Sequence, residues 1–219
     1  MRLIGSGRAS EIFDLGDGRV LRRFKAGGNP EREALAMRQA ERHGYPVPRV
    51  LDVSRNALVL ERIEGPTMLA RLRRRPWTLR TEMGRLARLH ERLHRMAGPV
   101  GLPELGAGDR LLHLDLHPDN VILGPEGPVV IDWANARRGD PAVDAALTWV
   151  VAATSGGAFG RLAVRWFLPH FERAELLRAL PAAAAFRLDD VNVTEREREA
   201  VRRLLVEAQP PSASSSARP

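Results

Sequence analysis

Three polar side chains near the middle of the chain have the types and spacing that phosphoryl transfer requires. The segment His113–Asn120 reads HLDLHPDN, and an apolar run further along the chain ends at Asp132. A carboxylate can orient an attacking hydroxyl and accept its proton, while oxygen ligands hold Mg²⁺ against nucleotide phosphates. We therefore expect Asp115 to be the catalytic base, with Asn120 and Asp132 as ligands of Mg²⁺. Amide and carboxylate oxygens suit magnesium better than zinc.

Ordinary structural roles for the same residues have to be weighed. Aspartate and asparagine in a proline-containing loop are common turn residues. Two histidines spaced by four residues form a metal pair only on a helix, and Pro118 opposes a helix between them. A turn at Gly124–Pro128 predicts that the following apolar run returns as a hairpin, which would bring Asp132 beside the loop.

The segment resembles the catalytic loop of the aminoglycoside phosphotransferase-like kinases, a family of small-molecule kinases that includes choline kinases. The usual form of this loop is His-Gly-Asp-x-His-x-x-Asn, followed by Ile-Asp-Trp or Ile-Asp-Phe. The matching residues are His113, Asp115, His117, Asn120 and Asp132. Leu114 replaces the usual glycine. By this resemblance the two histidines hydrogen-bond the loop and do no chemistry. Protein kinases normally lack the second histidine and the tryptophan.

The resemblance implies an α+β, two-lobed, protein-kinase-like fold. A small antiparallel β-sheet lobe with one helix would cover residues 1–64, with a hinge near 61–65. A larger, mainly helical catalytic and acceptor lobe would cover residues 65–208. The end of the chain, 209–219, is rich in proline, serine and alanine, and we expect it to be a disordered tail.

The pattern of apolar and turn residues gives the same division. The predicted strands of the first part are Leu3–Ile4, Ser10–Leu15, Arg19–Phe24, Val47–Val53 and Ala57–Ile63. The predicted helix between them is Glu31–His43, with Asn29 as its cap and Gly44 at its end.

Helices dominate the expected second part. The predicted helices are Thr67–Arg74, Thr78–Met96, Ala142–Thr154, Arg161–Leu180 with a break near Pro169, and Thr194–Glu207. Short strand-like pieces are expected at Arg110–Leu116 and Val121–Ile131, and a loop at Pro99–Gly108. We expect Asp140 to cap the helix that follows it and Asp144 to hold the catalytic loop. His90 and His94 are expected to be surface or satisfied core residues.

A nucleotide loop is predicted at Gly5, Ser6 and Gly7, because glycines let backbone amides approach phosphates closely. Taken alone, Gly-Ser-Gly is more often a plain turn. The resemblance also implies a phosphate-contacting lysine on the third strand, and here Arg22 occupies that position. Arginine keeps the charge but grips phosphate with a different geometry.

The partner of Arg22 is expected to be a glutamate on the next helix. Glu33 is the preferred candidate, and Glu31 is the alternative. By the same resemblance, backbone groups of Glu61 and Ile63 would meet the purine of the nucleotide. Side chains at this hinge do not distinguish ATP from GTP.

Composition narrows the class of protein. The net charge is +7, from 34 basic and 27 acidic residues, and there are no cysteines. A basic chain can indicate a nucleotide or nucleic-acid partner, but here arginines alternate with acids, which favours solvated helix faces. No aromatic-basic ladder or bilayer-length apolar run occurs, so we expect neither nucleic-acid nor membrane binding. The absence of cysteine and of an apolar leader favours a cytoplasmic protein.

The expected function is transfer of the γ-phosphate of ATP or GTP to a hydroxyl of a small molecule, with Mg²⁺ as cofactor. Two alternatives stay open. Arg22 and the short helical part would suit a nucleotide-binding pseudokinase with a regulatory role, and the short chain would suit a small atypical protein kinase. The acceptor is not identified, since a cationic aminoglycoside would need an acidic pocket. The oligomeric state is not indicated by the sequence.

Overall fold

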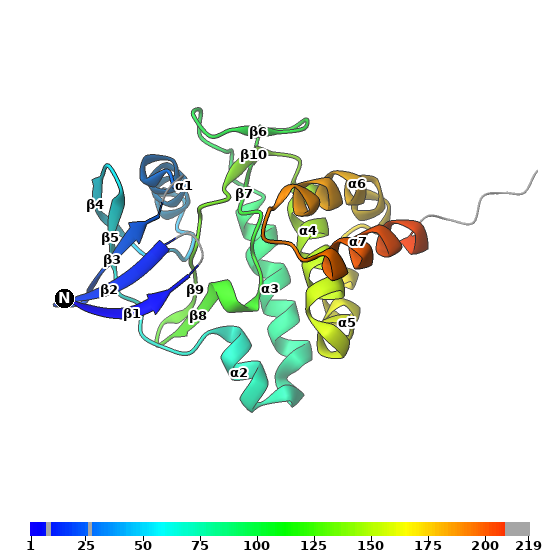
Figure 1. Cartoon of the computed structure of the whole chain (residues 1–219), viewed down its shortest axis with the longest axis horizontal. Coiled ribbons are helices and arrows are strands. Elements are labelled where there is room, and N and C mark those ends of the chain that lie inside the picture. The colour runs from blue at the N-terminus through cyan, green and yellow to red at the C-terminus, as the bar shows by residue number, and fades with distance from the viewer. Residues whose placement is uncertain (8–9, 26–27, 209–219) are drawn as a thin grey trace, which may run out of the picture.

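A computed structural model describes residues 1–7, 10–25 and 28–208. An antiparallel sheet with one helix forms the N-terminal part, and a mainly helical part follows it (Figure 1). This α+β architecture confirms the predicted fold class. The predicted tail at 209–219 lies outside the described residues. Within those residues, no helix is long and apolar enough to cross a bilayer.

The N-terminal sheet has five strands in the order β1-β2-β3-β5-β4. Their bounds are β1 Arg2–Ser6, β2 Ser10–Gly16, β3 Arg19–Phe24, β4 Val50–Ser54 and β5 Ala57–Glu61. Asp17 joins β2 to β3 with a positive φ of 53°, between two glycines that also have positive φ. Strand β4 begins later than predicted, because Pro46 and Pro48 precede it and proline cannot donate a ladder hydrogen bond.

Helix α1, Pro30–Arg42, packs beside β4 and β5. Asn29 caps it as predicted, since its side chain accepts a hydrogen bond from the backbone amide of Arg32 at 2.9 Å. Its buried face carries Ala36, Met37 and Ala40. The same face carries Glu33, a buried acid that needs a partner.

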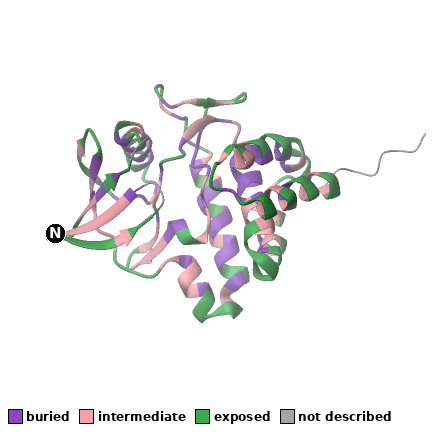
Figure 2. Ribbon diagram, in the orientation of Figure 1, coloured by how far each residue is buried: buried purple, intermediate pink, exposed green. Residues whose placement is uncertain are grey.

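Six helices make up the C-terminal part that the structure describes. They are α2 Met68–Arg74, α3 Leu79–Leu93, α4 Pro141–Ser155, α5 Gly157–Phe167, α6 Arg173–Asp189 and α7 Glu195–Ala208. Helix α4 is the most apolar, and α5, α6 and α7 all pack against it. Figure 2 shows buried residues between the helices of this part and exposed residues on its outer sides.

The prediction for the segment Arg161–Leu180 was wrong at both ends. Helix α5 already begins at Gly157. The predicted break near Pro169 is confirmed, because a 3₁₀ turn at Leu168–His170 separates α5 from α6. Helix α6 then continues through Pro181 to Asp189. Its alanines Ala183 and Ala184 are fully buried in the cluster around α4, so packing outweighs the hydrogen bond that proline removes.

Two small sheets position the segment His113–Asn120. The predicted hairpin is present as β8, Val121–Gly124, and β9, Gly127–Val130. Strand β7, Arg110–Leu112, joins β6, Glu104–Leu105, and β10, Arg137–Gly139, in a three-stranded sheet. The sequence predicted neither β6, which lies in the expected loop, nor β10. The segment His113–Asn120 therefore lies between β7 and β8.

Candidate active site

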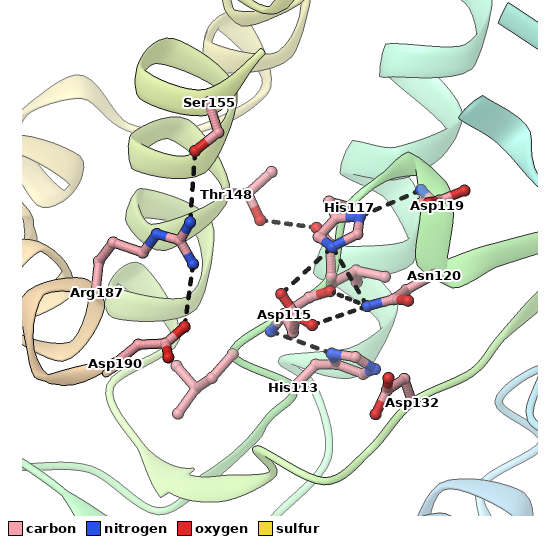
Figure 3. Close-up of polar contacts among 12 residues, drawn as sticks. His113, Asp115, His117, Asp119, Asn120, Asp132, Thr148, Ser155, Arg187 and Asp190 are labelled. Carbon is pink, nitrogen blue, oxygen red and sulfur yellow. Dashed lines mark hydrogen bonds and ion pairs between the residues drawn. The ribbon is translucent and has the colours of Figure 1, made fainter. Parts of the chain in front are cut away.

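The side chains of Asp115 and Asn120 are bound directly to each other (Figure 3). Asn120 Nδ2 donates to Asp115 Oδ2 at 3.0 Å and to the Asp115 carbonyl at 2.9 Å. A 3₁₀ turn, Pro118–Asn120, holds Asn120 in place, and the Asn120 amide donates to the carbonyl of His117. The Asp115 side chain is 31% exposed, so its carboxylate can be reached by a reactant.

The two histidines of the motif bind the loop on either side of Asp115. His113 Nδ1 accepts from the Asp115 amide at 3.2 Å, and its Nε2 lies 3.1 Å from the carbonyl of Ile131. Burial lowers the pKa of His113, so it is neutral at neutral pH. Its ring packs edge-on against Trp133. His113 thus connects the loop to the segment that carries Asp132.

His117 has a different environment. Its Nδ1 accepts from the Asp119 amide at 3.2 Å, and its Nε2 lies 3.4 Å from Asp115 Oδ1. Burial opposes protonation, but the neighbouring Asp115 carboxylate more than offsets it and raises the pKa of His117. His117 therefore contacts the carboxylate that the motif assigns to catalysis.

Asp144 anchors the backbone of the loop from α4. Its carboxylate accepts from the amides of His113 at 3.0 Å and Leu114 at 2.7 Å. Burial opposes ionisation, yet the hydrogen bond from His94 and the nearby histidines hold the pKa of Asp144 well below its usual value. Leu114 has a φ of 58°, a left-handed conformation that strains a residue with a branched side chain. Asp144 therefore stabilises the loop at its strained position, as predicted.

The sequence did not predict how His90 and His94 contribute to this anchor. His94 Nε2 lies 3.0 Å from Asp144 Oδ2. His90 is buried on the same helix, α3, and its Nε2 lies 3.1 Å from Thr148 Oγ1, which in turn donates to the carbonyl of Leu116. The spacing of four residues places both histidines on one helix face, and that spacing was the available signal.

Arg22 joins two carboxylates that lie far apart in the sequence. Its Nη1 donates to Glu33 Oε1 at 2.8 Å, and its Nη2 donates to Asp132 Oδ1 at 2.6 Å. The preferred pairing with Glu33 is therefore present, whereas Glu31 is exposed. Burial opposes ionisation of Asp132, but the charge of Arg22 holds its pKa below the usual value.

Glu33 also orients the residue that follows Asp132. Its Oε1 accepts from the backbone amide of Trp133 at 3.2 Å. Asp132 itself has a φ of 65°, a conformation that is uncommon outside glycine and concentrated at functional sites. The contact between Glu33 and Trp133 helps to hold this strained backbone.

The residues predicted to bind nucleotide surround one cavity of about 860 Å³. The predicted residues that line it are Gly5, Ser6, Gly7, Arg22, Glu33, Glu61, Ile63 and Asp132. Lys25 is exposed and donates to the Gly7 carbonyl at 2.8 Å. Asp119 and Thr67 also line the cavity, and neither was predicted from the sequence as a nucleotide-binding residue.

The side chains of Asn120 and Asp132 fit a magnesium ion chemically. The amide nitrogen of Asn120 is committed to Asp115, and its Oδ1 has no hydrogen-bond partner among the described residues. Asp132 uses Oδ1 to accept from Arg22, and its side chain is 41% exposed. One amide oxygen and one carboxylate are hard donors of the kind that magnesium prefers.

Comparisons with known proteins support the fold. The model of the phosphotransferase enzyme family matches residues 102–177, which include the catalytic loop and Asp132. A search of curated proteins finds no match.

Solved structures match over nearly the whole chain. A choline/ethanolamine kinase family protein from Mesorhizobium loti is 18% identical, with a TM-score of 0.62, over 95% of this chain and 86% of that one. A thermostable mutant of aminoglycoside phosphotransferase APH(4)-Ia, in a ternary complex with ADP and hygromycin B, is 17% identical, with a TM-score of 0.64, over 94% and 92%. ADP-bound aminoglycoside phosphotransferase APH(2'')-Ib is 17% identical, with a TM-score of 0.63, over 95% and 92%.

These comparisons confirm the resemblance that the loop motif indicated. The chain has the kinase-like fold of choline kinases and aminoglycoside phosphotransferases, and the segment that carries its catalytic loop matches the phosphotransferase enzyme family.

Proposed function

We propose that this protein is a phosphotransferase that moves the γ-phosphate of ATP or GTP to a hydroxyl of a small molecule. The observation that carries the proposal is the joint placement of Asp115, Asn120 and Asp132. Asp115 is held by Asn120, and Asp132 lines the cavity that the predicted nucleotide residues surround. The similar structure of an aminoglycoside phosphotransferase in complex with ADP and hygromycin B supports a nucleotide and a hydroxyl compound as the two reactants.

Asp115 would act on the acceptor. Its carboxylate would orient the hydroxyl and take its proton as the oxygen forms a bond to the γ-phosphorus and the bond to the β–γ bridging oxygen breaks. Asn120 would keep the carboxylate in position through the two hydrogen bonds from its amide. His117, 3.4 Å from Asp115 Oδ1, would restrict the rotation of that carboxylate. Catalysis would thus rest on positioning and charge neutralisation.

Nucleotide binding would involve both parts of the chain. Backbone amides of Gly5–Gly7 would approach the phosphates, and Arg22 would supply the positive charge. Backbone groups of Glu61 and Ile63 would meet the purine. Asn120 and Asp132 would hold Mg²⁺, which would neutralise charge on the phosphates when bound. In this proposal residues 1–64 are a nucleotide lobe and residues 65–208 a catalytic and acceptor lobe.

The test is release of ADP or GDP by the purified protein with a panel of hydroxyl compounds, with and without Mg²⁺. The panel should include choline, hygromycin B and simple alcohols. The proposal predicts acceptor-dependent release that is lost in EDTA, together with a phosphorylated acceptor in the ³¹P NMR spectrum. Mg²⁺-dependent nucleotide binding with no phosphorylated acceptor from any compound would contradict it.

One observation favours a second candidate, a nucleotide-binding pseudokinase. Both terminal nitrogens of Arg22 are committed to carboxylates, one of them to the predicted magnesium ligand Asp132. If a nucleotide did not displace this contact, the site would bind without turnover. Binding measured by calorimetry, in the absence of any product, would favour this candidate.

A further inference from the structure

A second cavity adjoins the one lined by the predicted nucleotide residues, and Asp119 lines both. It has a volume of about 450 Å³ and is formed by α2, α3, α4, α5 and the loop residues His117–Asp119. This size is typical of sites for small ligands. The ring of His117 lines the cavity and is also 3.4 Å from Asp115 Oδ1. One end of a molecule bound in this cavity would therefore lie next to the carboxylate of Asp115.

Most of the cavity wall is apolar. The main apolar contributors are Leu69 and Leu72 from α2, Met83 and Leu86 from α3, and Phe159 and Val164 from α5. Helix α4 adds Val151 and Ala152. Apolar walls bind ligands through burial of apolar surface, without direction-specific contacts.

Three polar side chains of the wall already have hydrogen-bond partners inside the protein. Thr148 Oγ1 donates to the carbonyl of Leu116 at 2.8 Å, and Ser155 Oγ donates to Glu197 at 2.6 Å. Asp119 Oδ1 accepts from Thr67 at 2.9 Å. Few hydrogen-bonding groups are thus left for a polyhydroxylated or polyamine acceptor.

The charge of the wall also excludes a polycation. Asp119 is the one carboxylate among the described lining residues, and the exposed guanidinium of Arg73 lies on the same wall. Arg73 makes no ion pair with any residue in the described ranges. On this wall a cationic acceptor would meet one carboxylate and one arginine, whose charges offset each other, and it would meet the further carboxylate of Asp115 only at its reacting end.

We infer that this cavity is the acceptor site and that it binds an uncharged alcohol with a largely apolar body. The hydroxyl of the alcohol reaches Asp115 past the ring of His117, and the apolar body lies between α2, α4 and α5. This inference rests on the proposed function for the identity of the reacting group. The apolar character of the site rests only on its lining residues.

The test uses straight-chain primary alcohols from 1-butanol to 1-octanol as acceptors, with ATP and Mg²⁺. Each added methylene should raise kcat/KM about fourfold until the cavity is filled, which is the factor expected for burial of one methylene. Choline and hygromycin B should react more slowly than 1-octanol. A flat dependence on chain length, or faster reaction of either cation, would overturn the inference.

A matched pair of variants tests whether the preference for long alcohols arises in this cavity. Ala152 and Ala153 are neighbours on α4 and both are half-buried, but only Ala152 lines this cavity, whereas Ala153 faces the groove beside α7. Ala152→Phe should fill the cavity and remove the preference for long alcohols, while Ala153→Phe should retain it. Circular dichroism would show that both variants are folded. Equal loss of the preference in both would overturn the inference.

A binding measurement separates this inference from the proposed function. Saturation-transfer NMR of 1-octanol, without nucleotide, should detect binding to the wild type and not to Ala152→Phe. Binding of this kind, with no phosphorylated product from any alcohol, choline or hygromycin B, would leave the apolar site standing and contradict the phosphotransferase proposal. The absence of 1-octanol binding to the wild type would overturn the apolar site.

Discussion

The Nη2 atom of Arg22 lies 2.6 Å from Oδ1 of Asp132, so a cation on the N-terminal sheet is paired with the predicted magnesium ligand of the helical part. The same guanidinium binds the buried carboxylate of Glu33. The side chain of Arg22 thus connects β3, α1 and the segment that follows β9. A lysine, with a single ammonium group, would present a point charge in place of this fork.

Removal of Arg22 should destabilise the fold. Arg22→Met leaves Glu33 buried and unpaired, and breaking a buried ion pair in this way costs about 3–5 kcal/mol. Urea unfolding measures the change. The double variant Arg22→Met, Glu33→Met should lose less stability than the single variant, because the fully buried carboxylate of Glu33 is then absent. A single variant as stable as the wild type would show that the pair contributes little.

Asn120→Ala should weaken the response to magnesium. The substitution removes one proposed ligand oxygen and also the hydrogen bonds that hold Asp115. The Mg²⁺ concentration for half-maximal nucleotide binding should rise by more than about tenfold. Isothermal titration calorimetry at several Mg²⁺ concentrations provides the measurement, and Asn135→Ala, at an exposed position, is the control. An unchanged Mg²⁺ requirement would exclude Asn120 as a ligand.

Acid should destabilise the protein through the cluster behind the catalytic loop. Burial lowers the pKa of His90 to about 3, so the unfolded chain, with an ordinary histidine, binds the proton more tightly. Stability from this residue is therefore complete above the ordinary pKa of about 6.5 and is lost as the pH falls towards 3. The pKa of Asp144 is also lowered, so Asp144 likewise contributes stability at neutral pH. That contribution is lost as the pH falls below 3.8, the ordinary pKa of the carboxyl.

Between about pH 7 and pH 5, we expect His90 to lower the free energy of unfolding by on the order of 2 kcal/mol. Thermal unfolding at several pH values measures it. His90→Gln should show a smaller decrease in Tm over this range, whereas His43→Gln, at an exposed histidine, should follow the wild type. Equal pH dependence in all three proteins would mean that His90 is not responsible.

Leu114→Gly tests why this chain has leucine where the resembling family has glycine. Glycine would relieve the positive φ, a gain of roughly 1–2 kcal/mol. It would also remove a side chain that is 2% exposed within the cluster around α4, a loss of about 2–5 kcal/mol for a buried leucine. We expect a net loss of stability on chemical denaturation. A more stable variant would show that backbone strain outweighs packing at this position.

The sequence was sufficient to predict the features that depend on local spacing. The loop motif, the hairpin before Asp132 and the Asn29 cap each occupy a short segment, and each has a specific residue signal. The pairing of Arg22 with Glu33 was implied by the resemblance to the aminoglycoside phosphotransferase-like kinases, in which a cation on the third strand pairs with a glutamate on the next helix, and the structure contains this contact.

Features that depend on distant packing were not predictable in this way. Strand β10 pairs with β6 and β7, and its short segment at Arg137–Gly139 carries no strand pattern of its own. Helix α6 continues past Pro181 because it packs on α4. The acceptor cavity is formed by four helices, so its lining emerges only when those helices are assembled.

The most direct test of the central claim is the turnover of Asp115→Asn. This variant keeps the size of the side chain and removes the proton acceptor. With the acceptor that the wild type phosphorylates best, kcat should fall by about 10²–10⁴, the usual contribution of a general base, while nucleotide affinity is retained. Asp109→Asn, at an exposed aspartate that lines neither cavity, is the control and should keep most of the activity. Turnover by Asp115→Asn equal to that of the wild type would contradict the assignment of Asp115 as the catalytic base.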